Sequence, residues 1–314
     1  MTAAIETRQL THRYGNRLAL SDLTITIPRG SIFVFLGPNG GGKTTLFRIL
    51  STLISPQAGT VTMLGSDVVA DTMSVRRQIG VVFQAPSLDK KLTVLENLYY
   101  QAAMYGVPRE LFRRRSQQLV SQLGLNDRIN ERTETLSGGL RRRVELAKGM
   151  IHAPQLMLMD EPSTGLDPGG RSDLWQYLQL LREESGVTIV LTSHLLDEAD
   201  RADRIAILHQ GKLVAEDTPA ALRDSVGGDS VTIDTQRPQE LAAIITDKFA
   251  CPTEVVSNQI RLEQPDGHKL IPQLVEAFPD QIEAIKLGKP TLEDVFIAKT
   301  GHRFWTAAGD NDVN

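Results

Sequence analysis

Apolar residues follow two patterns along the first part of the chain. At 5–10 and 23–27 apolar and polar residues alternate, which predicts half-exposed antiparallel strands. At 32–36, 156–159 and 187–192 the residues are mostly apolar, which predicts strands buried within a sheet. The two patterns together indicate an α/β core joined to a smaller antiparallel β subdomain.

Residues 93–150 differ in composition and are rich in Leu, Gln, Arg and Glu at helical spacing. Thr93 and Glu96 have the spacing of a capping box, in which each residue satisfies a free N–H at the start of a helix. The arginines at 113–115 are typical of a solvated helix face. We therefore expect a helical subdomain over about 93–150.

The glycine-containing segment 225–229 predicts a domain boundary. It would end a first domain at 1–225 and begin an accessory α+β domain at 229–303, leaving 304–314 as a flexible tail. The accessory domain lacks a glycine loop, an acid pair and a His/Cys cluster, so we interpret it as an interaction or regulatory element. Its expected order, β-α-β-β-α-β, is ferredoxin-like: strand 230–234, helix 238–249, hairpin 253–263, helix 268–278 and strand 281–287, followed by a short helix at 291–299.

A glycine-rich loop follows the buried strand 32–36 and leads into a helical pattern. Gly37, Gly42, Lys43 and Thr44 satisfy the pattern G-x-x-x-x-G-K-[ST] of a phosphate-binding P-loop. The glycines let backbone N–H groups form an anion-binding nest, and the next helix adds the positive end of its dipole. Lys43 would reach the phosphates and the Thr44 hydroxyl would hold Mg²⁺. The candidate nucleotide-binding residues of the loop are Gly37, Pro38, Asn39, Gly40, Gly41, Gly42, Lys43, Thr44 and Thr45.

A second glycine-containing turn, Ser137-Gly138-Gly139, precedes the helical pattern at 141–150. The same dipole argument makes this turn a second anion site, although it has no lysine in the loop. One lysine-bearing loop and one lysine-free site suggest a composite pocket. We expect a dimer in which each copy closes the nucleotide site of the other.

Polar side chains stand at the ends of three predicted core strands. Asp160 and Glu161 follow the run 156–159, His194 follows 187–192, and Gln84 ends an apolar stretch. Parallel strands end at one edge of the sheet, where such sheets bind ligands. One acid can therefore lie in the coordination shell of Mg²⁺, and the other can lie beside the attacking water. Taken singly, His194 fits a structural histidine and Gln84 a surface residue.

An aromatic residue, Tyr14, comes shortly before the phosphate loop. Its ring could stack on a nucleobase, although a tyrosine at a turn is more often a packing residue.

The composition describes an ordinary globular chain. It has 314 residues, of which 23% are charged, and a formal net charge of −4, which gives no reason to expect nucleic acid as a partner. The one cysteine excludes an internal disulfide. We expect neither a signal peptide nor a membrane-spanning stretch.

These motifs together resemble the ATP-binding subunit of ABC (ATP-binding-cassette) transporters, over about residues 5–220. The resemblance implies a RecA-like P-loop NTPase core that hydrolyses ATP with Mg²⁺. Site roles follow by position: Tyr14 would stack on adenine, and Gln84 would sense Mg²⁺ and the γ-phosphate. Asp160 would support Mg²⁺, Glu161 would polarise the lytic water, Asp167 would link the two sites and His194 would contact the γ-phosphate. In the second copy, Ser137, Gly138 and Gly139 would contact that phosphate.

Two positions depart from the family pattern. Leu140 stands where glutamine is usual, and we expect altered coupling rather than loss of hydrolysis. Gly41 replaces a slightly larger residue, which we expect to be tolerated.

Within the family, the arginine-rich stretch 140–145 and the segment 290–296 look like the daunorubicin-resistance group of bacterial exporters. That likeness implies a head-to-tail homodimer on a separate integral membrane permease, at the cytoplasmic face of the cell membrane, exporting drugs, lipids or other small molecules. The alternatives are a non-transport ATPase acting on ribosomes or nucleic acid, a nucleotide-gated regulatory module with weak turnover, and an importer subunit.

Overall fold

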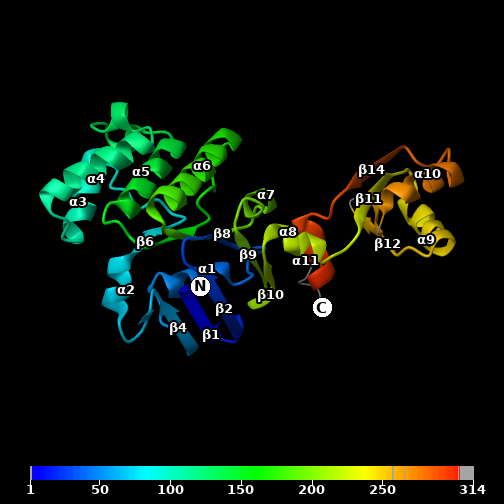
Figure 1. Ribbon diagram of the computed structural model, residues 1–314, viewed down its shortest axis with the longest axis horizontal. Coiled ribbons are helices and arrows are strands. Elements are labelled where there is room, and N and C mark those ends of the chain that lie inside the picture. The colour runs from blue at the N-terminus through cyan, green and yellow to red at the C-terminus, as the bar shows by residue number, and fades with distance from the viewer. Residues whose placement is uncertain (1, 257, 265, 303, 305–314) are drawn as a thin grey trace. The chain divides into compact units, whose positions relative to one another are not determined.

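In the computed structural model the chain divides into two compact units, Met1–Glu216 and Asp217–Asn314. The structure describes residues 2–256, 258–264, 266–302 and 304 (Figure 1). The division falls ahead of the segment 225–229 indicated by the sequence. The reason is that helix α8 (Pro219–Asp224) packs against α11 (Leu292–Thr300) and so belongs with the second unit.

The first unit is built on a six-stranded sheet of order β10-β9-β3-β8-β7-β6. The strands from β9 to β6 run parallel, so their carboxyl ends meet at one edge. The three apolar runs of the sequence are β3, β7 and β8, which lie next to one another as the buried centre of this sheet. The strands are β3 (Ile32–Leu36), β6 (Ile79–Val82), β7 (Leu156–Asp160), β8 (Thr188–Ser193), β9 (Arg204–His209) and β10 (Lys212–Asp217).

A second, antiparallel sheet of order β2-β1-β4-β5 forms the β subdomain. Helix α1 (Lys43–Leu50) buries Leu46, Phe47, Ile49 and Leu50 in a core cluster to which both sheets contribute. The strands are β1 (Ala3–Tyr14), β2 (Arg17–Pro28), β4 (Ala58–Met63) and β5 (Ser66–Asp67). β1 and β2 are longer than the sequence pattern predicts, because register shifts in their pairing interrupt the apolar alternation.

The predicted helical subdomain is present, and its capping box forms. The Thr93 hydroxyl accepts from Glu96 N at 3.2 Å and the Glu96 carboxylate accepts from Thr93 N at 2.8 Å. Of the helices in the described part of the chain, none is long and apolar enough to cross a membrane. The remaining helices of this unit are α2 (Thr72–Gln78), α3 (Val94–Met104), α4 (Arg109–Gln122), α5 (Gly138–Met150), α6 (Pro168–Ser185) and α7 (Leu196–Ala199), with short 3-10 turns at Asn126–Arg128 and Thr133–Thr135.

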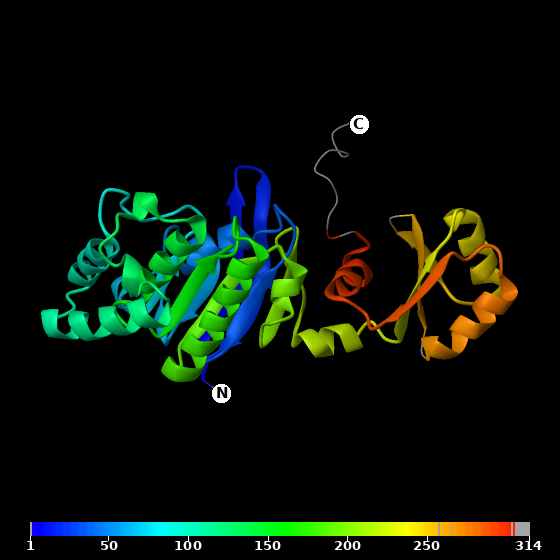
Figure 2. The same cartoon turned by 90° about the horizontal axis from the view of Figure 1, so that it is seen from above.

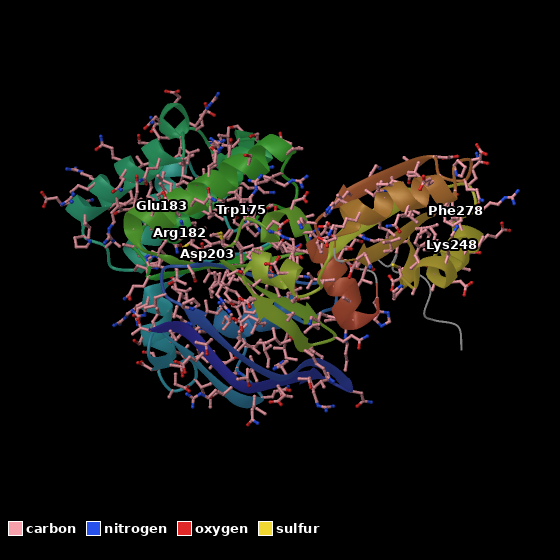
Figure 3. All side chains as sticks on the ribbon, turned by 45° about the vertical axis from the view of Figure 1, so that its right-hand side comes forward. Trp175, Arg182, Glu183, Asp203, Lys248 and Phe278 are labelled. Carbon is pink, nitrogen blue, oxygen red and sulfur yellow. The ribbon has the colours of Figure 1, made fainter. Side chains whose placement is uncertain are left out.

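One carboxylate fixes the start of the central strand β3. Asp203 Oδ2 accepts from Ile32 N at 2.7 Å, and Asp203 Oδ1 accepts from Arg182 Nη1 on α6 at 2.7 Å (Figure 3). A helix and two strands are therefore tied together at the edge opposite the carboxyl ends.

The second unit has the predicted ferredoxin-like order (Figure 2). Its sheet, β12-β13-β11-β14, is antiparallel throughout, and two helices bury one of its faces. The last strand begins at residue 284 rather than 281, because residues 279–281 form a turn and a bend follows at Glu283. The elements are β11 (Asp229–Asp234), α9 (Pro238–Phe249), β12 (Thr253–Val256), β13 (Gln259–Gln264), α10 (Gly267–Ala277) and β14 (Ala284–Gly288).

The expectation of a tail beginning at 304 is wrong at its first residue. Phe304 is 1% exposed, and its ring centroid lies 5.0 Å from that of Phe296 on α11. Burial of this apolar ring holds the chain in the second unit up to Phe304. Residues 305–314 lie outside the described residues.

A partly buried histidine gives the first unit a pH-dependent stability. The His152 ring stacks on Tyr105 at 3.8 Å and its Nε2 donates to Ile79 O at 2.9 Å. Burial lowers the pKa of His152 from 6.5 to about 4, so in that interval the unfolded chain binds more protons than the folded one.

The contribution of His152 to the unfolding free energy should therefore be fully present above its unfolded pKa of 6.5. As the pH drops toward about 4, the unfolding free energy should fall by about 3 kcal/mol. Denaturant unfolding at a series of pH values measures this slope. His152→Gln should flatten it, and His268→Gln, which changes an exposed histidine, should not. Equal slopes in all three proteins would contradict the assignment.

Candidate functional site

The loop between β3 and α1 has a shape that only glycine permits. Gly42 has φ +105°, and a Cβ on it would lie 2.6 Å from Ala19 O. A Cβ on Gly37 would lie 2.2 Å from Leu208 O. The loop is held to the hairpin beyond β9 by Gly211 N, which donates to Gly41 O at 3.1 Å. The backbone therefore forms a cradle that side chains would fill.

Helix α1 opens directly onto this cradle. Its N-cap is Gly42, which supplies no side-chain hydrogen bond, and its first turn holds no acid. The first N–H groups and the positive end of the helix dipole are thus left for an anion. Thr44 is exposed at this end of the helix, and Thr45 is buried. These features fit the phosphates of a nucleotide.

Lys43 is the buried cation of the cradle. Its side chain is 4% exposed, and Nζ donates to Gly37 O at 2.6 Å and to Pro38 O at 3.1 Å. Burial lowers the pKa of Lys43, whereas the charges of Glu161 and Asp160 raise it. The ammonium is therefore directed along the loop that would hold the phosphates.

The two adjacent acids at the end of β7 occupy different surroundings. Asp160 is 6% exposed, and its Oδ1 accepts from Thr192 Oγ1 at 2.6 Å. Burial raises the pKa of Asp160, and the Thr192 hydrogen bond acts against that rise. The same hydroxyl accepts from Glu161 N at 3.0 Å, and Glu161 has φ 44°, in the left-handed region. A non-glycine residue in this region is strained, and such strain is concentrated at functional sites.

Four side chains converge on the Glu161 carboxylate. Gln84 Nε2 donates to Oε2 at 3.1 Å, and Thr164 Oγ1 donates to the same oxygen at 3.3 Å. His194 Nδ1 lies 3.2 Å from Oε1 and Lys43 Nζ lies 4.0 Å from it. These residues come from four separate segments that end at one edge of the sheet. The structure thus brings together Lys43, Gln84, Asp160, Glu161 and His194.

Three other predicted side chains, those of Ser137, Asp167 and Tyr14, are exposed at the ends of their own elements. Ser137 caps α5, with Oγ accepting from Leu140 N at 3.3 Å, and Asp167 caps α6, with Oδ1 accepting from Gly170 N at 2.6 Å. Gly138 is exposed and Gly139 half-buried. Tyr14 ends β1 rather than standing in a turn; it is 45% exposed, and its ring lies edge-on to His12.

Across the described residues, no three His, Cys, Asp or Glu side chains gather in a way that could hold a metal ion. A metal here would need the Thr44 hydroxyl, the Gln84 amide and phosphate oxygens beside Asp160. That set of oxygens suits Mg²⁺, which keeps several waters and uses few carboxylates.

Sequence reasoning missed three residues that support the site: Thr192, Thr164 and Arg142. Thr192 bonds to both acids because β7 and β8 pair in parallel, with Asp160 opposite Thr192. Its only signal in the sequence is a hydroxyl at the end of an apolar run, next to Ser193 and His194. Arg142 is one of three consecutive arginines in the sequence, which do not reveal that its side chain is only 7% exposed.

Gly42→Ala should remove both the fold of the loop and ATP binding. It combines left-handed strain with a backbone clash, and we expect a loss of about 3 kcal/mol or more in unfolding free energy. Gly65→Ala is the matched control, since Gly65 has φ +90° and no atom within 4 Å of a Cβ. It should cost about 1–2 kcal/mol and leave binding unchanged. Equal losses in the two variants would argue against the cradle.

Comparison with known proteins supports one assignment. The family described as ABC transporter matches residues 20–164. The chain is 34% identical to the daunorubicin/doxorubicin resistance ATP-binding protein DrrA of Streptomyces peucetius, over 96% of this chain and 93% of that protein. It is 35% identical to the Nod factor export ATP-binding protein I of Rhizobium sp. (strain N33), over 95% of this chain and 97% of that protein.

A solved structure of an ATP-binding subunit of an ABC transporter agrees with these relatives. It superposes with a TM-score of 0.65 at 28% identity, covering 72% of this chain and 94% of that one. ATP-binding subunits of this family dimerise and pair with membrane permease components. The phosphate cradle, the acid pair and these likenesses agree: the chain belongs to the ATP-binding subunits of ABC transporters and is an ATPase.

Proposed function

We propose that two copies of this chain bind two Mg·ATP between them, head to tail, and drive a membrane permease that exports small molecules. The observation that carries the catalytic part is the convergence of Gln84, His194 and Lys43 on the Glu161 carboxylate. The export direction is supported by relatives named for drug resistance and for Nod factor export.

Glu161 would orient the attacking water and accept its proton. Gln84 and Thr164 hold Oε2 by hydrogen bonds. The other oxygen, Oε1, lies beside His194 Nδ1 and faces Lys43 Nζ in the cradle. His194 would then contact the γ-phosphate and Tyr14 would stack on the adenine. Bound Mg²⁺ would neutralise phosphate charge, with Thr44, Gln84 and Asp160 as the residues that hold it.

The composite pocket needs a second copy. Ser137 and Gly138 are exposed at the start of α5, as an anion site for a neighbouring molecule requires. Asp167, exposed at the start of α6, would link the two sites.

The permease would dock on α3, near the loop that follows Gln84. That loop is tied to the helix by Asp89 N, which donates to Asn97 Oδ1 at 2.9 Å. The helix exposes Tyr99, Tyr100 and Met104, the last at 82%. Exposed apolar side chains grouped in this way are typical of a protein interface. The permease would keep the protein at the cytoplasmic face of the membrane.

Charge on α3 should release the permease without stopping ATP hydrolysis. Tyr100→Glu with Met104→Glu would place two carboxylates against an apolar partner, and we expect co-purification of an integral membrane protein to fall at least about tenfold. Met73→Glu, which alters an exposed methionine on α2, is the control. Unchanged co-purification of the α3 variant would contradict the docking site. Recovery of ribosomes or nucleic acid in place of a membrane protein would reject the transport function.

A further inference from the structure

Arg142 is a charged residue buried inside the first unit. It lies on the second turn of α5 and is 7% exposed, and Glu145, one turn later, is 4% exposed. Their side chains meet at 2.8 Å, from Arg142 Nη1 to Glu145 Oε2. A buried ion pair contributes little to stability by itself, because desolvating both charges offsets their attraction. The other contacts of the pair point to a different use.

The guanidinium of Arg142 donates to three backbone carbonyls of the hydrolysis site. Nη2 donates to Glu161 O at 3.2 Å and Nε donates to Pro162 O at 2.6 Å. Nη1 donates to Phe83 O at 2.9 Å, one residue before Gln84. One side chain therefore joins the backbone around Glu161 to the backbone beside Gln84.

Glu145 extends this link to the loop after Gln84. Its second oxygen, Oε1, accepts from Ser87 N at 2.7 Å. Lys148, on the next turn of α5, donates from Nζ to Ser87 O at 2.6 Å. Both backbone groups of Ser87 are thus held by one helix, whose first residues, 137–139, form the proposed contact to the second copy.

The geometry needs a guanidinium rather than a positive charge alone. Glu161 has φ 44°, a strained conformation that persists only when neighbouring groups hold it. Arginine offers several N–H donors in a rigid planar fork, whereas a lysine ammonium is a compact point charge on a flexible stem. Arg142 can therefore fix the peptide after Glu161 and, with it, the direction of the Glu161 side chain.

We propose that Arg142 and Glu145 form a positioning pair that holds the Glu161 carboxylate and the Gln84 amide in register for ATP hydrolysis. Both residues would act through the backbone beside Glu161 and Gln84 rather than on the nucleotide. Since the pair sits on α5, it connects the proposed contact with the second copy to the backbone of Glu161. This inference rests on the proposed roles of Glu161 and Gln84.

Two changes in the full-length chain test the pair. Arg142→Lys keeps the charge and loses the fork, and Arg142→Gln with Glu145→Gln removes both charges, so that no unpaired buried charge remains. Each should lower kcat by roughly 10- to 100-fold, as expected for a misplaced catalytic group. The KM for ATP and the stoichiometry of ATP binding should stay within about threefold, because ground-state binding is untouched.

The neighbouring ion pair supplies the control. Arg143 Nη2 and Asp173 Oδ2 lie 2.5 Å apart at the surface of α5 and α6, so Arg143→Gln with Asp173→Asn should leave both kinetic parameters unchanged. Glu145→Gln keeps an oxygen for Ser87 N and should lose less kcat than Glu145→Ala. A purely structural pair would instead lower the melting temperature and the ATP-binding stoichiometry together.

Glu161→Gln, measured in parallel, separates this inference from the proposed function. If Glu161→Gln is inactive while Arg142→Lys keeps wild-type kcat, the positioning pair is wrong and the role of Glu161 stands. If Glu161→Gln keeps wild-type kcat, the role of Glu161 is wrong and the pair falls with it.

Discussion

Glu161→Gln should lower the rate of ATP hydrolysis by about 100- to 10,000-fold while leaving ATP binding intact. The amide has the shape of the carboxylate but cannot accept the proton of the attacking water. Its oxygen can still accept from Gln84 Nε2, now at 3.1 Å from Oε2, so the surrounding contacts survive. Steady-state phosphate release and equilibrium binding of ATP are the two measurements.

The same variant should accumulate as an ATP-bound dimer, because closure no longer leads to hydrolysis. Size-exclusion chromatography with and without ATP reports this species. Glu134→Gln, which removes a half-buried carboxylate paired with Lys91 and remote in sequence from the cradle, is the control and should behave as wild type. A Glu161→Gln protein that releases phosphate at the wild-type rate would refute the catalytic assignment.

Lys43→Ala should weaken ATP binding by at least about 100-fold, the second large effect. Lys43 is a buried cation that donates to the loop backbone, and charge-assisted hydrogen bonds to phosphate are among the strongest polar contacts. The loss of a single buried contact of this kind is on the order of 2–3 kcal/mol. Fluorescence titration with a nucleotide analogue measures the affinity.

The fold of the Lys43 variant must be checked separately, because Nζ also donates to Gly37 O and Pro38 O. Thermal unfolding without nucleotide gives this check, and we expect a change of only a few degrees. Added ATP should raise the melting temperature of the wild type but not of the variant. Lys91→Ala removes an exposed lysine and should keep both responses. Wild-type affinity in Lys43→Ala would mean that the cradle binds something else.

Several features could be predicted from the sequence because the motifs are local. The phosphate loop, the capping box at Thr93 and the order of elements in the second unit each depend on residues close together in the chain. Apolar runs identified β3, β7 and β8, since buried strands need apolar residues on both faces. The division between the units falls ahead of the segment indicated by the sequence, because α8 packs against α11, far away in the sequence.

The support around the acids could not be predicted in the same way. Thr192 bonds to Asp160 only because two parallel strands pair in one register. Arg142 stands in a run of three arginines, and nothing in that run distinguishes it from its neighbours, yet its guanidinium donates to the carbonyl of Glu161. The sequence shows only how charged residues are spaced along a helix, whereas burial depends on what packs against each face of that helix.

By itself, the sequence determined the chemistry that each segment offers: an anion cradle at 37–45, two acids after one strand and a histidine after another. Only the tertiary structure decided that Gln84, His194 and Lys43 meet at the Glu161 carboxylate, and that Arg142 donates to the backbone carbonyl of Glu161. The physical reason is the range of the interactions. Loop conformation and helix capping follow from neighbouring residues, whereas the pairing of strands and the burial of a charge depend on the packing of the whole unit.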